Sequence, residues 1–231
     1  MNRVGFSTRR TFLAGISSLA LAGVRPVRAS ESWTIGLWQS HALTVHAGRN
    51  PEENAITTIE HAFDHADVAV DIDAAKKPVV LPDGPERPTC SGKAFDYWFR
   101  QRSHPSNRSN LLLTDFGGGG CAAVGGSSAM AGGADLADEV DHAWQRPWSR
   151  VGMSLFAILH ELAHNAGYAH AEPTGFAYEI GDEIHVSPAT TWAVDDVHSS
   201  CGGDHPDIDP RRQIFHLYYS PCTAGLFKTN R

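Results

Sequence analysis

The residues best suited to chemistry stand together between His160 and His170, in a segment that reads HELAHNAGYAH and has the pattern HExxHxxGxxH. On a helix, His160 and His164 are one turn apart on the same face, so both imidazoles can reach one zinc ion at about 2.0 Å. Glu161 lies about 100° further round the helix, where it is placed to hold a zinc-bound water rather than to complete the clamp. The pattern therefore predicts His160 and His164 as metal ligands and Glu161 as the general base.

A third ligand is expected from His170. If the helix continued, His170 would lie roughly 9 Å beyond His164 along the axis and could not touch the same ion. The chain must therefore turn at Gly167, because glycine accepts the left-handed conformation that ends a helix. We expect this turn to bring His170 back to the metal.

The residues around the motif favour an amphipathic helix. An apolar stripe about 100° wide is expected to pack against the core, and its members are Val151, Leu155, Ile158, Leu159 and Leu162. His160 and His164 project from the opposite side. One face of the helix thus packs while the other binds metal.

Over residues 149–170 the chain resembles the metzincin clan of zinc endopeptidases, whose signature is this extended motif. The resemblance implies an α+β catalytic domain. Its N-terminal subdomain, to about residue 167, would hold a mixed sheet, a backing helix and the active-site helix. A largely irregular C-terminal subdomain would follow from about residue 168, with the cleft between the two. Ala171, after the third histidine, matches no subgroup, so adamalysin-like and astacin-like assignments both stay open.

A second segment fits the same clan. Residues Leu111 to Gly126 are similar to the corresponding part of adamalysin-like members. Within it, Cys121 to Gly125 looks like the edge strand that borders the cleft and receives the substrate as an added antiparallel strand. An ordinary surface loop is the alternative for this segment.

The chain departs from the clan at the methionine turn beneath the zinc, because no methionine follows Met153. The nearest match is Phe215 to Tyr219, in which Leu217 would replace the methionine as an apolar residue of similar volume. Tyr219 would stand where astacin-like and serralysin-like members carry a tyrosine near the metal. The resemblance thus implies that the Tyr219 hydroxyl helps to stabilise the oxyanion.

These residues together predict a zinc endopeptidase. Zinc held by the three histidines would polarise the scissile carbonyl and lower the pKa of its water to about 7, and Glu161 would carry the proton to the leaving amine. Two alternatives stay open: a secreted zinc-binding protein that has lost catalysis, against which the intact Glu161 argues, and a zinc hydrolase acting on a non-peptide amide. We expect a protein or peptide substrate and a monomeric enzyme.

The first 29 residues have the pattern of an export signal. Ser7 to Leu13 contains twin arginines, Phe12 to Val24 is apolar but too short to span a bilayer, and Val27 to Ala29 offers a signal peptidase site. We expect export by the Tat translocase, cleavage after Ala29, and a mature, secreted or extracytoplasmic domain of residues 30–231. An uncleaved anchor helix is the alternative.

Four cysteines in an exported chain favour two disulfides. Three pairings are possible, and the most local one joins Cys90 to Cys121 and Cys201 to Cys222. Buried free thiols are the alternative.

Periodicity predicts the elements that precede the motif. We expect strands at 33–39, 68–72 and 111–116, a helix at 54–66 capped by Asn54, and a short helix at 94–100. His61 and His65 on the outer face of the longer helix are interpreted as a solvated pair, not a metal clamp. The glycine run 117–120 lacks the GK[ST] ending of a phosphate loop, so nucleotide binding is not expected.

The charge balance excludes a general nucleic-acid binder. The signal segment carries five arginines and no acidic residue, so the remaining 202 residues have 14 basic and 26 acidic side chains and a net charge of −12. Five aspartates and two histidines lie between Asp195 and Asp209. A solvated acidic loop is the favoured interpretation there, and a Ca²⁺ site is the alternative.

Overall fold

The computed structural model describes residues 32–84, 86–138, 140–141, 143, 145–170, 175, 177–189 and 210–230. The chain from Glu31 to Arg231 forms one compact unit. The predicted signal segment, Cys201 and the acidic loop 195–209 lie outside the described residues, so the predictions made for them are not tested. Among the described helices, none is long and apolar enough to cross a membrane.

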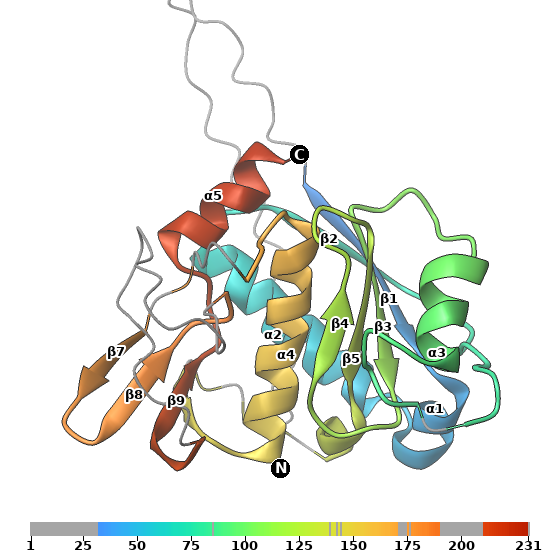
Figure 1. Ribbon diagram of the computed structural model, residues 1–231, viewed down its shortest axis with the longest axis horizontal. Helices are drawn as coiled ribbons and strands as arrows, with labels where there is room; N and C mark the ends of the chain where they lie inside the picture. The colour runs from blue at the N-terminus through green and yellow to red at the C-terminus, as the bar shows by residue number, and fades with distance from the viewer. Residues whose placement is uncertain are drawn as a thin grey trace, which may run out of the picture. The chain divides into compact units, whose positions relative to one another are not determined.

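A five-stranded mixed sheet forms the first layer, with strand order β2-β1-β3-β5-β4 (Figure 1). Four of its strands run parallel, namely β1 (Trp33–Gln39), β2 (Val70–Ala74), β3 (Ser109–Thr114) and β5 (Ser128–Gly132). The short strand β4 (Gly120–Ala122) pairs with β5 in the antiparallel direction and forms one edge of the sheet. This confirms a mixed sheet and an α+β fold.

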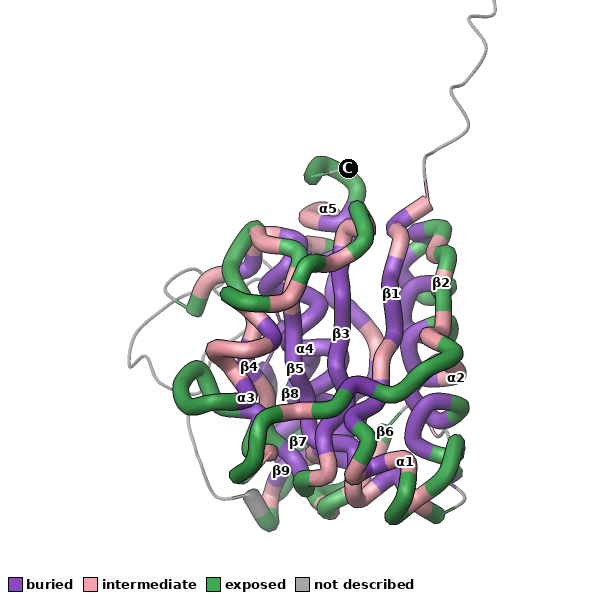
Figure 2. The backbone as a smooth tube through the Cα atoms, turned by 90° about the vertical axis from the view of Figure 1, so that its right-hand side faces the viewer, coloured by how far each residue is buried: buried purple, intermediate pink, exposed green. Residues whose placement is uncertain are grey.

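Helices cover both faces of this sheet, which is why every residue of β3 is buried (Figure 2). Leu111 and Leu113 join the large core shared with α2 (Asn50–His65) and α4 (Arg150–Asn165). Leu112 points to the opposite face, where it meets Trp98. Trp98 belongs to a π-helical turn, Asp96–Gln101, that continues α3 (Lys93–Phe95).

The helix α4 carries the HExxH motif and is capped as its sequence predicts. The side chain of Ser149 accepts a hydrogen bond from the backbone N–H of Gly152. The helix packs against β4 and β5 and against α2. All the apolar residues of the predicted stripe except Val151 are fully buried in the core, so the sheet fixes the orientation of the face that bears the histidines.

The C-terminal part contains more regular structure than expected. Its strands β7 (Ala177–Ile180), β8 (Glu183–Val186) and β9 (Gln213–His216) belong to a second sheet, in which β9 also pairs with β6 (Gln145–Pro147) from the chain before α4. The strand order of this sheet is β6-β9-β8-β7. The final helix, α5 (Pro221–Thr229), is capped by Ser220. A largely irregular subdomain is therefore not what the described residues form. Short strands with weak alternation give little sequence signal, which explains the difference.

Shorter elements link these layers. They are α1 (His41–Ala47), and the 3₁₀ turns Ala134–Leu136 and Pro210–Arg212.

Three predicted elements have different boundaries in the structure: one helix and two strands. The helix predicted over 54–66 begins four residues earlier, at Asn50, with Pro51 in its first turn. Asn54 lies inside the helix, and its amide donates to the carbonyls of Leu136 and Asp138 at 3.0 Å each. Asn54, whose residue type is typical of a helix N-cap, thus binds the turn around Leu136 instead. The strands predicted at 68–72 and 111–116 are each displaced by two residues, to 70–74 and 109–114.

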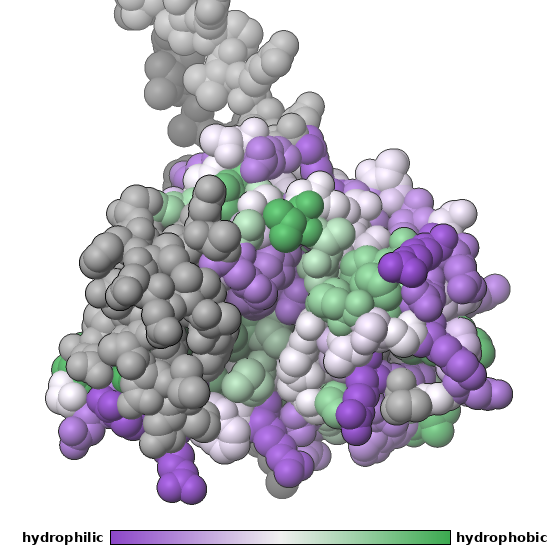
Figure 3. All heavy atoms as spheres, viewed as in Figure 1, coloured by the Kyte–Doolittle hydropathy of each residue, from purple (hydrophilic) through white to green (hydrophobic). Residues whose placement is uncertain are grey.

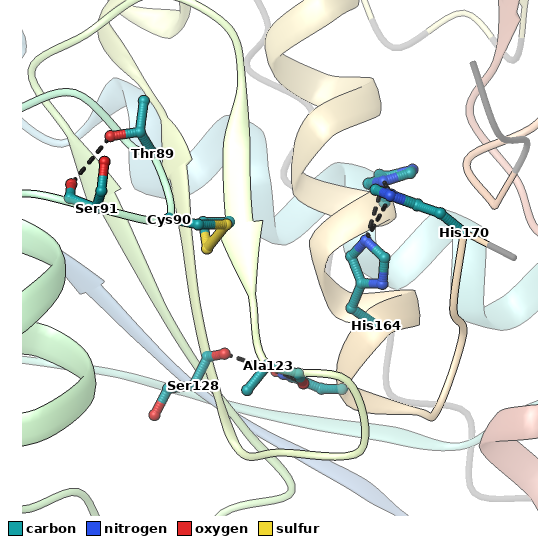
Figure 4. The surroundings of a disulfide bond; sticks show 10 residues. Thr89, Cys90, Ser91, Ala123, Ser128, His164 and His170 are labelled. Carbon is teal, nitrogen blue, oxygen red and sulfur yellow. Dashed lines mark hydrogen bonds between the residues drawn. A yellow bond between two sulfur atoms is a disulfide. The ribbon is translucent and has the colours of Figure 1, made fainter. Parts of the chain in front are cut away.

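A disulfide joins Cys90 to Cys121, as predicted (Figure 4). It attaches the loop before α3 to the edge strand β4. Cys201 lies outside the described residues, so the second predicted pairing stays a prediction.

Candidate metal centre

Three histidine nitrogens meet at one point beside α4. The Nε2 atoms of His160, His164 and His170 lie 3.1 Å from one another in all three pairs. His160 and His164 come from the same face of the helix, whereas His170 follows the turn that ends it. Figure 4 shows His170 directed at His164 from the segment beyond the helix. Among the histidine, cysteine and acidic side chains of the described residues, these three histidines form the group that is close enough to hold one metal ion.

The turn that returns His170 is made by Gly167, as the sequence predicts. Its φ is 103°, in the left-handed region that favours glycine. Its backbone N–H donates to the carbonyl of His164, and the N–H of Tyr168 donates to that of Ala163. These bonds satisfy carbonyls of the last turn of α4, which ends at Asn165, two residues before Gly167.

The outer nitrogen of two rings fixes how the inner nitrogen can be used. Nδ1 of His160 donates to the carbonyl of Pro188 at 2.5 Å, and Nδ1 of His164 donates to that of Tyr168 at 2.7 Å. A neutral imidazole that carries its proton on Nδ1 has a lone pair on Nε2. The two Nε2 lone pairs therefore face one another at 3.1 Å, an arrangement that repels unless a cation lies between them.

The spacing fits a tetrahedral metal site. Two nitrogens bound to one zinc ion at about 2.0–2.1 Å lie about 3.3 Å apart in ideal tetrahedral geometry, close to the 3.1 Å seen here. Burial lowers the pKa of His160 to about 3 and lowers the pKa of His164 and of His170, in each case as the largest cause. The rings are thus neutral at pH 7, which is the form that binds metal.

Glu161 lies beside the three histidines and lines a cleft. Its side chain is 5% exposed, and burial raises the pKa of its carboxyl to about 8. A cation held by the neighbouring histidines would favour the ionised form and oppose this effect. The cleft has a volume of about 290 Å³ and is lined by Gly119, Gly120, Met153, Phe156, Ala157, His160 and Glu161. Figure 3 shows a hollow with a hydrophobic floor on this face of the molecule.

The opposite wall of the cleft contains a residue that sequence reasoning missed. A Cβ added to Gly120 would lie 2.4 Å from Cγ of Glu161 and 2.5 Å from Oε1. Only glycine therefore lets β4 approach the glutamate this closely. From the sequence, the glycine run 117–120 indicates only that a phosphate loop is not expected, and a close approach of the backbone to a functional side chain is another reason for glycines in such a run.

Tyr219 is placed differently from the expectation based on the methionine turn. Its hydroxyl donates to the carbonyl of Leu159 at 3.0 Å, and its ring packs on Phe63 and Phe227. The residue is 2% exposed, and Leu217 is buried in the same core. The hydroxyl proton is thus directed at the backbone of α4, and this geometry does not support a role for Tyr219 at an oxyanion.

His61 and His65 are exposed on α2 and are not part of the metal centre. The ring of His65 packs on that of Tyr218, with 4.2 Å between the ring centroids.

A scan against protein-family models and a search among curated proteins both find no match for this chain.

Proposed function

We propose that this chain is a secreted zinc-dependent endopeptidase of the metzincin type. The observation that carries the proposal is the convergence of three Nε2 atoms, two of them with their Nδ1 protons committed to carbonyl groups, next to a buried glutamate. Three neutral imidazoles at this spacing suit zinc, whose catalytic sites keep a fourth position for water or substrate. The ion would be held by His160, His164 and His170.

The chemistry is shared between the ion and one side chain. A bound zinc supplies a Lewis acid for the scissile carbonyl and lowers the pKa of water to about 7. Glu161 accepts a proton from the attacking water and passes it to the leaving amine as general base and then general acid. Its position one residue after a ligand keeps its carboxylate in the cleft and off the nitrogen cluster.

The fold supports a peptide as substrate. The edge strand β4 lies against the cleft, and one of its edges pairs with β5 while the other has no strand beside it in the described sheet. An extended peptide could add to that edge as a further strand, with its carbonyl presented to the cleft. The sheet, α2 and α4 also follow the order that the metzincin resemblance implies.

Two other functions compete with this one. A zinc-binding protein without catalysis would not need a carboxylate in the cleft, whereas Glu161 occupies it and Gly120 makes room for it. A hydrolase of non-peptide amides would use the same groups, so substrate tests must separate it from a peptidase.

Export by the Tat pathway, with cleavage after Ala29, is part of the proposal.

The proposal is tested with purified mature protein, by measuring zinc content and casein cleavage with and without a chelator. We expect one zinc per chain and cleavage that is lost with the chelator and restored by zinc. Glu161→Gln should retain the zinc and lose almost all cleavage, whereas Glu60→Gln, on the exposed surface of α2, should behave as wild type. Wild-type cleavage by Glu161→Gln would refute the mechanism, and hydrolysis of simple amides without casein cleavage would favour the non-peptide alternative.

A further inference from the structure

The glycine segment 117–120 is held firmly although it has no side chains with which to pack. On one side, the end of β5 and the turn after it bind the segment and the residue before it: the N–H of Gly132 donates to the carbonyl of Gly119 at 3.1 Å, and the N–H of Ala134 donates to that of Phe116 at 3.0 Å. A Cβ on Gly132 would lie 2.4 Å from the carbonyl oxygen of Gly118, so the two backbones are in close contact. The segment therefore lies directly on this turn.

On the other side, a side chain of α4 binds the same segment. The hydroxyl of Ser154 accepts the N–H of Gly118 at 3.0 Å and donates its own proton to Oδ2 of Asp135 at 3.2 Å. Ser154 is fully buried, so its hydroxyl can form these bonds without competition from solvent. Asp135 sets the direction of the hydroxyl proton and thereby leaves an oxygen lone pair for Gly118.

Ser154 and Glu161 are two turns apart on the same face of α4. Ser154 binds Gly118, and Glu161 touches Gly120, so the helix and the glycine segment run side by side and meet at two points. Gly118 and Gly119 have φ values of 63° and 68°, a conformation that is costly for other residues. Without an anchor, such a segment would have many backbone conformations available.

We propose that Ser154 and Asp135 are positioning residues, which hold the glycine segment against Glu161 so that its carboxylate keeps one place in the cleft. The expected effect on catalysis rests on the proposed function. The expected effect on the glycine segment rests only on the hydrogen bonds described above. Loss of the anchor lets Gly120 move away and gives the Glu161 side chain additional rotamers. Proton transfer depends on that geometry, whereas the three histidines are held by other contacts: His160 by Pro188, His164 by Tyr168, and His170 by the turn at Gly167.

The variant Ser154→Ala tests this proposal, with Ser109→Ala as the matched control. Ser109 is also fully buried and accepts one hydrogen bond, from Nε1 of Trp33, in β3. Both variants should bind one zinc and lose similar stability. Ser154→Ala alone should lower kcat by about 10- to 100-fold with little change in KM. Equal kcat values in the two variants would overturn the proposed role in catalysis.

Asp135 provides a conservative rescue. Asp135→Asn keeps an oxygen that can accept the Ser154 proton and should retain most of the activity, whereas Asp135→Leu should behave like Ser154→Ala. Activity lost equally in both Asp135 variants would show that the carboxylate charge matters and not the orientation of the serine, which contradicts the proposal.

A second readout does not depend on activity. Hydrogen exchange of the Gly118 amide should be at least about tenfold faster in Ser154→Ala than in wild type or Ser109→Ala, because the amide loses its acceptor. Unchanged exchange would overturn the proposal. If the wild-type protein cleaves no substrate, the proposed function fails, and faster exchange in Ser154→Ala would still support the anchoring of the segment.

Discussion

Two groups of histidines in the described part of the chain bring ring nitrogens within about 3 Å of each other, and they use those nitrogens differently. In the metal centre, the Nδ1 atoms of His160 and His164 donate to carbonyls, so their Nε2 lone pairs converge. Between β8 and β9, Nδ1 of His185 lies 2.9 Å from Nε2 of His216, and Nδ1 of His216 lies 2.7 Å from the Tyr218 hydroxyl. Donors and acceptors can alternate along that second chain.

The difference explains why the first group is suited to hold a metal ion and the second is not. A ring nitrogen paired with another ring nitrogen makes a hydrogen bond when one of them carries a proton. When the Nδ1 protons of two neutral rings are bound by carbonyls, their Nε2 atoms carry only lone pairs and need a cation between them. The outer partners of the rings, and not the number of histidines, therefore decide which group is suited to hold a cation.

The largest effect is expected from His170→Ala. Removal of one of three ligands should weaken zinc binding by at least about 100-fold, more than the 10- to 100-fold typical of the loss of an outer partner. His185→Gln in the second group should leave the zinc affinity unchanged. Competition with a chromogenic chelator measures both affinities. Unchanged zinc binding in His170→Ala would remove this protein from the three-histidine class.

The next effect concerns the base and not the ligands. Gly120→Ala should lower kcat by about 100-fold, because the new methyl group occupies the place of the Glu161 side chain. Zinc content should stay at one per chain. Gly225→Ala serves as the matched control, because an added Cβ there meets nothing within 4 Å and, as at Gly120, the backbone is not left-handed. Full activity of Gly120→Ala would mean that Glu161 works from another position.

The second histidine group predicts a dependence of stability on pH. Burial, with a smaller contribution from His185, lowers the pKa of His216 to about 4 from 6.5. Between pH 6.5 and pH 4, His216 is protonated in the unfolded chain but still neutral in the folded one. The stability that neutral His216 provides is therefore lost as the pH falls from 6.5 towards 4. One such proton changes the unfolding free energy by up to about 1.4 kcal/mol per pH unit.

Urea unfolding in the presence of a chelator, between pH 7 and pH 4.5, measures this contribution without that of zinc. His216→Gln should show a weaker loss of stability over the same range than wild type. An identical pH profile in the two proteins would show that His216 titrates normally in the fold.

The smallest effects are expected around Tyr219. Tyr219→Phe removes one buried hydrogen bond to Leu159 and should cost about 1 kcal/mol of stability, with kcat unchanged. Leu217→Met should cost less than about 1.5 kcal/mol because it conserves volume. A kcat reduced tenfold or more in Tyr219→Phe, at normal stability, would restore the oxyanion role that the resemblance implied.

The sequence predicted the parts of the site that depend on local geometry. Helical periodicity alone placed His160, Glu161 and His164. Because His170 could not reach the same ion if the helix continued, the sequence also predicted a left-handed turn at Gly167. These features depend on residues within about two helical turns, where backbone geometry has few solutions. The strand at 33–39 and the Cys90–Cys121 disulfide were also predicted correctly.

The missed features all depend on contacts between distant segments. The carbonyl of Pro188 that orients His160 is 28 residues away, and Gly120 and Asn54 acquire their roles from α4 and from the turn after β5. Tyr219 has the expected sequence spacing, yet the packing of Phe63 and Phe227 directs its hydroxyl to Leu159. Spacing along the chain does not reveal which face of a distant element a side chain will meet.

X-ray absorption at the zinc edge of the purified protein tests the central claim most directly. We expect one zinc per chain, with three imidazole nitrogens at about 2.0–2.1 Å and one further light ligand. In His170→Ala, the imidazole count of any zinc that remains should fall to two. A sulfur ligand, only two imidazoles in the wild-type protein, or no stoichiometric zinc after loading would contradict the account.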